Sequence, residues 1–298
     1  MTDHRAGPPR IGVWYPTEGM AHAEAAAFAA RLEALGFDGL WIGETFGRDP
    51  FAHIANIAHA TTRLRFATGI ANVYHRHPGA MAQAANTLGE QLPERFVLGL
   101  GVSSPQIVER HRGLDHTRPL SFLRDYLDRM DAAMYFSVPP PFPVPRLLAA
   151  IGPRMLELAA ARSAGAFTYN MNPDHTRFAK GVVGADAELV VEQKVMLCTD
   201  AGKARAAAAS VLDFYRKAPG YRAGWRRLGF TDQQIDTGDP AFLDSIVAWG
   251  DEHAIRDRLA AHVDAGATQL VVQPVDPDLG GGGLPWSVLE LLAPTVAG

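Results

Sequence analysis

Residues 63–78, RLRFATGIANVYHRHP, predict a buried strand with a polar end. Leu64, Phe66 and Thr68 alternate with their neighbours, and an apolar step follows at residues 70–71, which is typical of a short strand with one face in a core. Gly69 permits backbone conformations that larger residues resist. Mostly polar residues then lead to Pro78, which opens an alanine-rich helix. We therefore expect this strand to place polar groups at one rim of a sheet.

The alternation of strand and helix continues on both sides of this stretch. Seven more apolar segments are expected as strands with helices between them, which favours a parallel sheet. Eight such units in a chain of 298 residues predict an α/β fold of the (β/α)₈ TIM barrel type. A doubly wound sheet is the alternative, but no GxGxxG motif follows the first strand. The seven further strands are expected at residues 11–15, 39–43, 95–100, 146–151, 166–169, 189–197 and 268–273.

One barrel domain is expected to span residues 1–298, with an excursion of short helices at about 219–250, after the seventh strand. Residues 138–145 are expected to be a stiff proline-rich connector, and residues 278–283 a glycine-rich, mobile loop. The helices of the barrel are expected at residues 21–35, 50–60, 78–91, 121–136, 155–163, 201–216, 251–265 and 284–292.

The composition is that of an ordinary globular protein, with 47% hydrophobic and 20% charged residues. A net charge of -4 gives no basic surface for nucleic acid. Cys198 is the one cysteine, so an intramolecular disulfide is impossible, and its apolar neighbours predict a core position. The N-terminus has no signal-peptide pattern, and no apolar run reaches the roughly 20 residues of a membrane span. We expect a cytoplasmic protein that does not bind membranes.

In a barrel of this type, the functional site lies at the carboxyl ends of the strands. Polar or glycine residues end most of the expected strands, and we take these as the candidate site. In chain order they are Tyr15; Glu44 and Thr45; Gly69 and the residues up to His77; Gly101, Ser103 and Ser104; Ala149, Ala150, Ile151 and Gly152; Tyr169, Asn170 and Asn172; and Gln273.

Two of these strand ends have the character of anion sites. Gly152-Pro153 places free backbone N–H groups at the start of a helix, where a phosphate is stabilised. Gly101, Ser103 and Ser104 offer a small loop with hydroxyl groups after the fourth strand. Each could also be a plain tight turn. Two such ends on neighbouring strands are compatible with a ligand that carries a phosphate as well as with plain turns.

Two further features have competing interpretations. Glu44 is either an acid or base beside the ligand or a partner for a helix dipole. His75 and His77 have the His-x-His spacing that some metal-dependent barrel hydrolases use. A metal site needs additional ligands, and the ends of the other strands carry no His or Asp. We therefore expect no metal and assign the histidines to the loop and the start of the next helix.

The chain resembles the bacterial luciferase-like monooxygenase family, in particular its branch of coenzyme F420-dependent oxidoreductases. The resemblance covers residues 11–275 and rests on the order and spacing of several segments rather than on one motif. These segments are GFDGLWIGETF, RLRFATGIANVYHRHP with the helix after it, ERFVLGLG, LLAAIGP, VAWGD and QLVVQPV.

The resemblance implies a (β/α)₈ barrel with a cis peptide bond at Gly69-Ile70, behind the flavin or deazaflavin ring. It places Glu44 where relatives carry Asp or His near the reacting face of the ring, with Thr45 beside it. Asn72 would bond the ring edge. Two segments would hold the ring edge and the phosphate tail: Gly101 with Ser103 and Ser104, and Ala149, Ala150, Ile151 and Gly152.

Three departures from the family pattern narrow the function. Ser104 replaces the catalytic acid of the F420-dependent sugar-phosphate dehydrogenases, Thr45 replaces their His, and Asn172-Pro173 replaces a basic residue. A sugar phosphate is therefore not the expected substrate. Luciferases carry His where this chain has Glu44, so light emission is not expected either.

The predicted activity is hydride transfer between F420 and a small organic substrate, with Glu44 as the catalytic residue. F420 is favoured over FMN because its tail is acidic and Arg112 and Arg154 lie where such a tail could leave the barrel. The alternatives are an FMN-dependent monooxygenase of the luciferase-like type, a barrel that binds flavin or deazaflavin without turnover, and a metal-dependent hydrolase. A homodimer is also implied by the resemblance.

Overall fold

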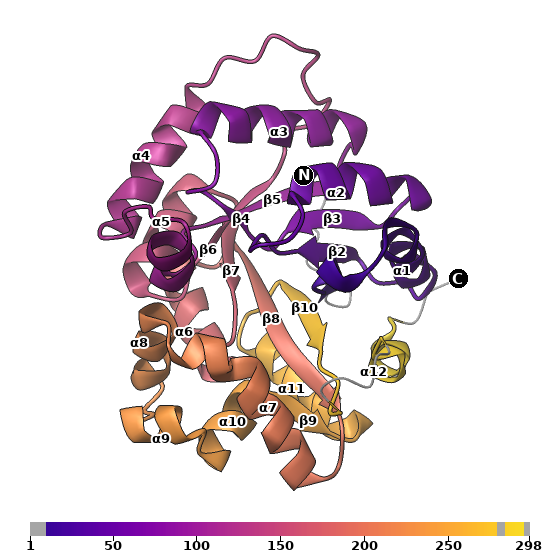
Figure 1. The fold of residues 1–298 in the computed structure, drawn as a ribbon, viewed down its shortest axis with the longest axis vertical. Helices are drawn as coiled ribbons and strands as arrows, with labels where there is room; N and C mark the ends of the chain where they lie inside the picture. The colour runs from indigo at the N-terminus through magenta and orange to yellow at the C-terminus, as the bar shows by residue number, and fades with distance from the viewer. Residues whose placement is uncertain (1–9, 279–283, 295–298) are drawn as a thin grey trace.

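The computed structural model describes residues 10–278 and 284–294, and within them eight parallel strands form a closed barrel (Figure 1). Each strand pairs with the next in the sequence of barrel strands, and β10 pairs with both β1 and β8, which closes the ring. The predicted TIM barrel is confirmed, and the doubly wound alternative is wrong. The barrel strands are β1 (Arg10–Trp14), β2 (Gly39–Ile42), β3 (Arg65–Thr68), β5 (Phe96–Gly101), β6 (Arg146–Ala149), β7 (Gly165–Thr168), β8 (Glu188–Leu197) and β10 (Gln269–Pro274).

Two short strands lie beside the barrel strands. β4 (Ala71–Asn72) continues the path of β3 and pairs with the end of β5. β9 (Ala248–Gly250) pairs with the last residues of β8, which extends beyond its pairing with β10. The sequence prediction had placed residues 248–250 in the helical excursion, which is wrong. Three residues are too few to show the alternation of apolar and polar residues that marks a strand in the sequence. Pairing with β8 holds this segment in the extended conformation.

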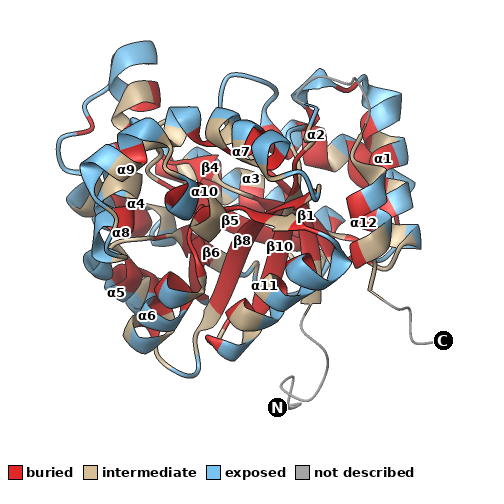
Figure 2. Cartoon of the chain, turned by 90° about the horizontal axis from the view of Figure 1, so that it is seen from below, coloured by how far each residue is buried: buried red, intermediate tan, exposed pale blue. Residues whose placement is uncertain are grey.

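Helices surround the barrel and turn their buried faces toward it (Figure 2). Most begin with proline, whose missing N–H costs nothing in the first turn. Their bounds are α1 (His22–Ala34), α2 (Pro50–Ile57), α3 (Pro78–Gln91), α4 (Pro119–Asp131), α5 (Pro153–Arg162), α6 (Pro173–Val183), α7 (Ala201–Arg216), α8 (Pro219–Arg227), α9 (Asp232–Thr237), α10 (Pro240–Ile246), α11 (Glu252–Asp264) and α12 (Trp286–Leu292). There are also two short 3₁₀-helices, η1 (Thr17–Gly19) and η2 (Ala58–Ala60), and a π-helix, η3 (Gln106–His111).

The helical elements differ from expectation in three places. α4 ends at Asp131, although the helical pattern continues to residue 136. Met134 and Phe136 are 74% and 91% exposed, so these helix-forming residues have no core to pack against. α6 and η3 were not predicted as helical elements. Most of the loop predicted at 278–283 lies outside the described residues.

Two hydrophobic layers fix the barrel. The larger lies between the outer face of the strands and the helices. The smaller fills the barrel interior, where Trp41 stacks on Phe167 with ring centroids 4.8 Å apart. Trp14, Ile70 and Tyr169 cover this interior layer. Because the interior is packed, a ligand has room only above it, at the carboxyl ends of the strands.

A close contact between β3 and β5 sets the height at which β3 ends. A Cβ atom on Gly99 would lie 2.0 Å from the carbonyl oxygen of Thr68, so no other residue fits there without moving a strand. The hydroxyl of Thr68 accepts a hydrogen bond from Gly99 N (2.9 Å) and donates one to Gly99 O (2.7 Å). The exit of β3 is therefore held directly beside β5.

None of the helices in residues 10–278 and 284–294 combines the length and the apolar character that a membrane crossing requires.

Candidate active site

The peptide bond between Gly69 and Ile70 is cis, as the family resemblance implies. Gly69 N donates to Ile42 O at 2.7 Å, and the indole N–H of Trp14 donates to Gly69 O at 2.6 Å. A Cβ atom on Gly69 would lie 3.0 Å from Trp14 Cδ1, so the indole packs closely against this backbone. The side chain of Ile70 joins Trp14 and Tyr169 at the top of the barrel interior.

Glu44, at the end of β2, is bonded to the exit of β3. Its Oε2 accepts hydrogen bonds from Asn72 N (2.7 Å) and Arg76 Nη1 (2.9 Å), and its Oε1 accepts one from Arg76 Nη2 (2.6 Å). His75 Nδ1 lies 3.4 Å from Oε1, and the side chain of Glu44 is only 7% exposed. The predicted catalytic role of Glu44 stays a prediction. The occupied carboxylate favours a role in positioning the β3 exit over one as a proton relay.

The side chains around Glu44 are also engaged with one another. Asn72 is fully buried; its Oδ1 accepts from Tyr74 N, and its Nδ2 lies 3.0 Å from His75 Nε2. His77 accepts a hydrogen bond from Gly79 N and so caps α3, as the helix-start assignment predicted. Within the described residues, no group of three or more His, Cys, Asp or Glu could hold a metal ion. The structure thus brings Asn72 beside Glu44, with its amide directed at its own loop.

Thr45 does not take part in this network. It is exposed, and its carbonyl oxygen accepts a hydrogen bond from Arg112 Nη2 at 3.1 Å. The guanidinium of Arg112 also lies over the ring of Phe46, 5.5 Å from its centroid. Arg112 therefore anchors the segment after β2. This structural role is an alternative to the role at the cofactor tail that the sequence predicted.

The ends of β5 and β6 form a cradle for a ligand. A Cβ atom on Gly101 would lie 2.8 Å from Ile70 Cγ1 and 3.0 Å from Ala149 Cβ, so glycine lets these two side chains pack directly against the end of β5. Ser103 has a left-handed backbone (φ 57°), and the buried Oγ of Ser104 has no hydrogen-bond partner in the described protein. Ala149, Ala150, Ile151 and Gly152 follow on β6, and Gly152 is the N-cap of α5 without a capping side chain. An unpartnered hydroxyl and an uncapped helix start suit a polar, anionic ligand.

His175, in α6, holds the end of β6 in place. Its Nε2 lies 2.9 Å from the carbonyl oxygen of Ile151, next to Gly152. Burial lowers the pKa of His175 to about 4. His262, in α11, is buried between Thr176 Oγ1 (2.8 Å) and Gln193 Oε1 (2.9 Å), and burial, with the nearby charge of Arg258, lowers its pKa to about 3. Both imidazoles are therefore neutral in the folded protein at neutral pH.

We expect these two histidines to make the protein sensitive to acid. Both titrate near pH 6.5 in the unfolded chain, so their contribution is complete above that pH and is lost as the pH falls toward 4 and then 3. Two protons taken up only by the unfolded chain lower the free energy of unfolding by about 3 kcal/mol per pH unit near pH 5. Urea unfolding at pH 7, 6 and 5 measures this slope. His262→Gln should remove about half of it, and an unchanged slope in that variant would contradict the assignment.

A buried polar cluster joins Asn170 and Gln273, which the sequence prediction named as candidates at strand ends, to Lys194 and Glu192, which it missed. Lys194 Nζ donates to Asn170 Oδ1 (2.6 Å), Gln273 Oε1 (3.0 Å) and Glu192 Oε1 (3.1 Å). The ammonium group also lies 4.1 Å from the ring centroid of Tyr169. Burial lowers the pKa of Lys194, and its attraction to Glu192 opposes that shift. The sequence signal that could have revealed this cluster is the polar run Glu192-Gln193-Lys194 inside an otherwise apolar strand.

Three tyrosines extend this cluster toward the mouth of the barrel. Tyr169 donates to Gln273 Oε1 at 2.6 Å, and the hydroxyl of Tyr215 lies 3.2 Å from that of Tyr169. Tyr221, from α8, packs edge-on against Tyr215 with ring centroids 5.1 Å apart. Burial raises the pKa of Tyr215 to about 12 and those of Tyr169 and Tyr221 well above their usual range. All three hydroxyls therefore stay protonated. Because Tyr169 donates its one proton to Gln273, Tyr215 is the donor in the pair with Tyr169, and the hydroxyl of Tyr221 remains as a donor. We call Tyr169, Tyr215, Tyr221 and Gln273 the tyrosine wall.

Of three further aromatic residues, Trp225 packs against this wall, with its ring centroid 5.8 Å from that of Tyr221. Tyr15 packs on Phe28, between the sheet and the helices, and Tyr74 stacks on Phe122. The indole N–H of Trp225 donates to Asn170 O and is buried. Tyr15 and Trp225 thus belong to the hydrophobic packing around the site.

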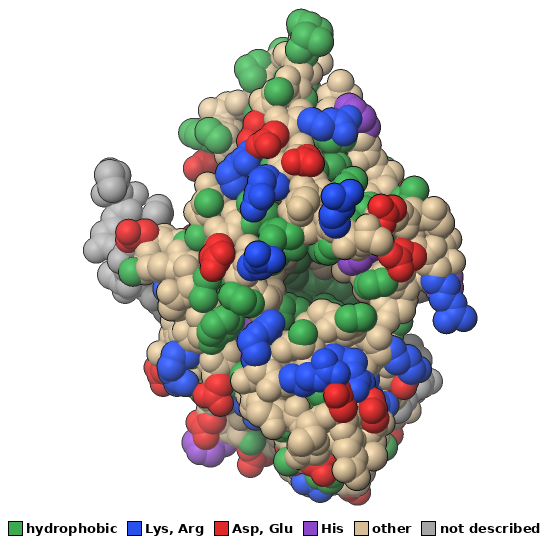
Figure 3. Space-filling model, turned by 90° about the vertical axis from the view of Figure 1, so that its left-hand side faces the viewer, with side chains coloured by type: hydrophobic (Ala, Val, Ile, Leu, Met, Phe, Trp, Pro, Cys, Tyr) green, Lys and Arg blue, Asp and Glu red, His purple; other side chains and the backbone are tan. Residues whose placement is uncertain are grey.

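Figure 3 shows the side of the molecule that carries α4, α5, α6 and α8 in Figure 1. A hollow opens in this face, with hydrophobic side chains beside it and Lys and Arg side chains around it. Arg227 of α8 brings a positive charge to the start of α5, because its Nη2 would lie 3.5 Å from a Cβ atom on Gly152. A ligand with both apolar and anionic parts suits this surface.

The profile of a family described as luciferase-like monooxygenase matches residues 6–269. A Mycobacterium tuberculosis protein, provisionally named a coenzyme F420-dependent oxidoreductase, is 26% identical over 88% of this chain and 93% of its own. The structure of a coenzyme F420-dependent tetrahydromethanopterin reductase from Methanopyrus kandleri superposes with a TM-score of 0.77 at 18% identity, over 96% of this chain and 98% of that one. An F420-dependent secondary alcohol dehydrogenase, in complex with an F420-acetone adduct, gives a TM-score of 0.73 at 16% identity, over 90% and 94%. The two structural matches support the barrel fold.

Proposed function

Because the chain belongs to the luciferase-like monooxygenase family, we propose that it is an F420-dependent oxidoreductase that transfers a hydride between the deazaflavin and a small organic substrate. The observation that carries this proposal is the cradle of Gly101, Ser104 and Gly152 beside the cis Gly69-Ile70 bond, in a barrel whose relatives are F420-dependent enzymes.

The residues present fit such a cofactor. Ile70 offers an apolar surface above the barrel interior, and glycine at position 101 lets its side chain pack against the end of β5. The free hydroxyl of Ser104 can bond the ring edge, with Ser103 and the Ala149–Ile151 backbone on the neighbouring strand ends. The N-terminal turn of α5 at Gly152 can hold the phosphate. Thr45 and Asn72 stay in this set as predicted contacts.

When bound, the deazaflavin supplies the hydride chemistry, and the protein supplies orientation and a dry site. Trp14 holds the Gly69 carbonyl, and Glu44 with Arg76 holds the segment that follows. The packed interior below Ile70 excludes water from one side. These contacts fix the backbone against which the ring would lie.

The tyrosine wall is the substrate side in this proposal. The ammonium of Lys194 is enclosed by three acceptors, so the wall presents hydroxyl groups rather than a cation. Asn172 is also occupied, because it caps α6 through His175 N and donates to Ser245 Oγ. A hydroxyl donor beside this neutralised lysine favours an uncharged substrate with a carbonyl or alcohol oxygen over a phosphorylated one.

Cofactor identity is tested by titrating the purified protein with F420 and following deazaflavin fluorescence, and by recording its absorbance. Saturable binding of F420, and hydride exchange with a neutral alcohol or ketone, is the expected result. A protein that is isolated with FMN and does not bind F420 would favour the monooxygenase alternative. Binding of F420 with no turnover of any alcohol or ketone in a broad panel would favour the binding-protein alternative.

The Glu44→Gln variant distinguishes a role of Glu44 in positioning the β3 exit from a role as a proton relay. The variant loses the ion pair with Arg76, whose side chain is only 15% exposed. We therefore expect F420 to bind roughly tenfold more weakly, which corresponds to about 1.4 kcal/mol of binding free energy. Turnover at saturating F420 should fall less than this affinity. Asp49→Asn is the matched control, since Asp49 also binds Arg76 (2.7 Å) but is half-exposed. Intact affinity with a large loss of turnover would instead support the relay.

We also propose that the protein acts as a cytoplasmic homodimer that binds neither nucleic acid nor membranes. Exposed apolar side chains at Met134, Phe136 and Val138, in the loop after α4, support a surface for self-association. Light scattering coupled to size-exclusion chromatography measures the mass in solution. A monomer at micromolar concentration would contradict the dimer.

A further inference from the structure

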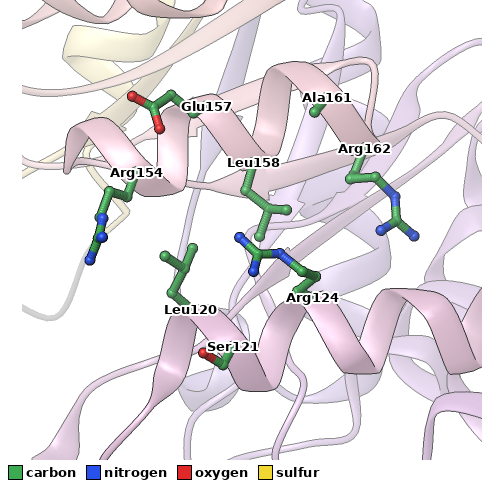
Figure 4. Close-up of a pocket in the computed structure, with 8 residues that line it drawn as sticks. All are labelled: Leu120, Ser121, Arg124, Arg154, Glu157, Leu158, Ala161 and Arg162. Carbon is green, nitrogen blue, oxygen red and sulfur yellow. The ribbon is translucent and has the colours of Figure 1, made fainter.

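A groove of ≈ 560 Å³ between α4 and α5 is not suited to a neutral substrate (Figure 4). Its lining residues, among them Leu120, Arg124 and Leu158, all come from these two helices, on the outer wall of the barrel. A substrate bound there would lie outside the barrel mouth, where the chemistry of such barrels takes place. The contact with the substrate must therefore come from residues that lie over the strand ends.

Helix α8 lies on the carboxyl ends of β6 and β7. A Cβ atom on Gly224 would lie 2.8 Å from Ile151 Cγ2, and the indole N–H of Trp225 donates to Asn170 O at 2.9 Å. Tyr221 precedes Gly224 and Trp225 by three and four residues, which places all three on one face of the helix. Tyr221 therefore faces the barrel mouth, beside the cradle.

The hydroxyl of Tyr221 has no hydrogen-bond partner within residues 10–278 and 284–294. The other two hydroxyls of the tyrosine wall are engaged, because Tyr169 donates to Gln273 and Tyr215 donates to Tyr169. The side chain of Tyr221 is half-buried, so its hydroxyl is not sealed inside the protein. It is the hydroxyl of the wall that is free to bond a substrate.

Aromatic contacts hold the ring of Tyr221 in place. Its centroid lies 5.1 Å from that of Tyr215 and 6.4 Å from that of Tyr169. Tyr169 in turn packs edge-on against Trp14 at 5.7 Å, and the indole N–H of Trp14 donates to Gly69 O. Two side chains thus connect Tyr221 to the backbone against which the cofactor ring would lie.

Reduction of a carbonyl group needs a proton on its oxygen as well as a hydride on its carbon. Glu44 is a poor source of this proton, because Asn72 N and the guanidinium of Arg76 occupy its carboxylate oxygens. The ammonium group of Lys194 is enclosed by three acceptors. Burial raises the pKa of Tyr221 well above its usual range, so its phenol keeps the proton until a substrate takes it.

We propose that Tyr221 is the catalytic acid, whose hydroxyl bonds the carbonyl oxygen of a neutral ketone and then gives it the proton. This inference rests on the proposed function. As a hydride adds to the carbonyl carbon, the π electron pair of the C=O bond moves to oxygen, and that oxygen takes the proton of Tyr221. The phenolate regains a proton from water at the mouth. The ketone has then gained one hydride and one proton, which makes it an alcohol.

The contact can be tested without turnover by fluorine NMR of a Tyr221→fluorotyrosine variant. Its resonance should shift when cyclohexanone is added, with F420 bound or absent. It should shift much less with chlorocyclohexane, which has a similar shape but is a weak hydrogen-bond acceptor. Tyr135→fluorotyrosine, in the loop after α4, is the control and should respond to neither compound.

The proton transfer is tested by Tyr221→Phe, which keeps the ring and its aromatic contacts. For a panel of neutral ketones that includes cyclohexanone, we expect kcat of reduction to fall by about 10²- to 10⁴-fold, with little change in KM. F420 affinity, measured by deazaflavin fluorescence, should be unchanged. Tyr135→Phe removes the same hydroxyl from a distant loop and should change neither quantity. Tyr215→Phe leaves the hydroxyl of Tyr221 in place and should lower kcat by less than about tenfold.

The outcomes separate this assignment from the proposed function. A fluorine resonance at position 221 that does not respond to cyclohexanone, or a kcat of Tyr221→Phe within about tenfold of wild type, would refute the role of Tyr221 while F420 binding and turnover remain. Failure of the wild-type protein to bind F420, or to reduce any ketone of the panel, would refute the proposed function, and the assignment of Tyr221 with it.

Discussion

Lys194→Met is expected to lower the free energy of unfolding by about 3–5 kcal/mol. Lys194 and Glu192 are 1% and 0% exposed, and the ammonium lies 3.1 Å from the carboxylate. Methionine fills a similar volume but leaves the charge of Glu192 in the interior without its partner. Asn170 and Gln273 lose a donor at the same time. Urea unfolding measured by circular dichroism gives the difference directly.

A double variant identifies the cause of this loss. In Glu192→Gln/Lys194→Met, the amide can still accept the hydrogen bond that Asn170 N donates to Glu192, and no buried charge remains. We expect the double variant to recover about 2 kcal/mol relative to Lys194→Met. A double variant no more stable than Lys194→Met would show that the charge of Glu192 is not the problem. Weaker binding of neutral substrates in both variants would further support the tyrosine wall as the substrate side.

Gly99→Ala is expected to destabilise the protein by about 3 kcal/mol and to weaken F420 binding at least roughly tenfold. The added methyl group would lie 2.0 Å from the carbonyl oxygen of Thr68, and backbone cannot give way as the end of a side chain can. β3 and β5 would have to separate, which would move Gly69 and Ile70 against the cradle at Gly101. Thermal unfolding and deazaflavin fluorescence measure the two effects.

Gly181→Ala is the matched control for this change. Gly181 lies in α6, and a Cβ atom there would have nothing within 4 Å. Alanine should stabilise this helix by about 0.5–1 kcal/mol and leave F420 binding unchanged. If Gly99→Ala behaved like Gly181→Ala, the close approach of β3 and β5 would not set the position of the β3 exit.

The barrel could be predicted because its strands carry their own signals. Apolar runs ended by glycine or polar residues identified all eight barrel strands, and their number and order implied closure. α6 was missed because its first residues, PDHT, read as a turn. Its start depends on Asn172, whose side chain accepts a hydrogen bond from His175 N. Asn followed by Pro is a helix-start pattern in the sequence, which the prediction did not use.

The strand-end residues of the candidate site were predicted on both sides of the barrel, but their partners on other elements were missed. Strand ends with glycine or serine led to Gly69, Gly101 and Ser104, because these residue types are informative alone. The partner of Glu44 is Arg76, 32 residues later, and spacing in the sequence could not reveal that ion pair. The tyrosine wall combines residues from β7, α7, α8 and β10, so only the folded chain brings it together.

The placement of α8, α9 and α10 has a consequence for how such proteins diversify. These helices form one insertion, residues 219–246, between the barrel units of β8 and β10, and they deliver Tyr221 to the tyrosine wall. The cradle for the cofactor comes from β3, β5 and β6, in the other half of the chain. Substrate selectivity can therefore evolve by exchange or remodelling of a single segment, while cofactor recognition is inherited unchanged. For protein engineering, this makes residues 219–246 a natural unit for grafting and for targeted libraries.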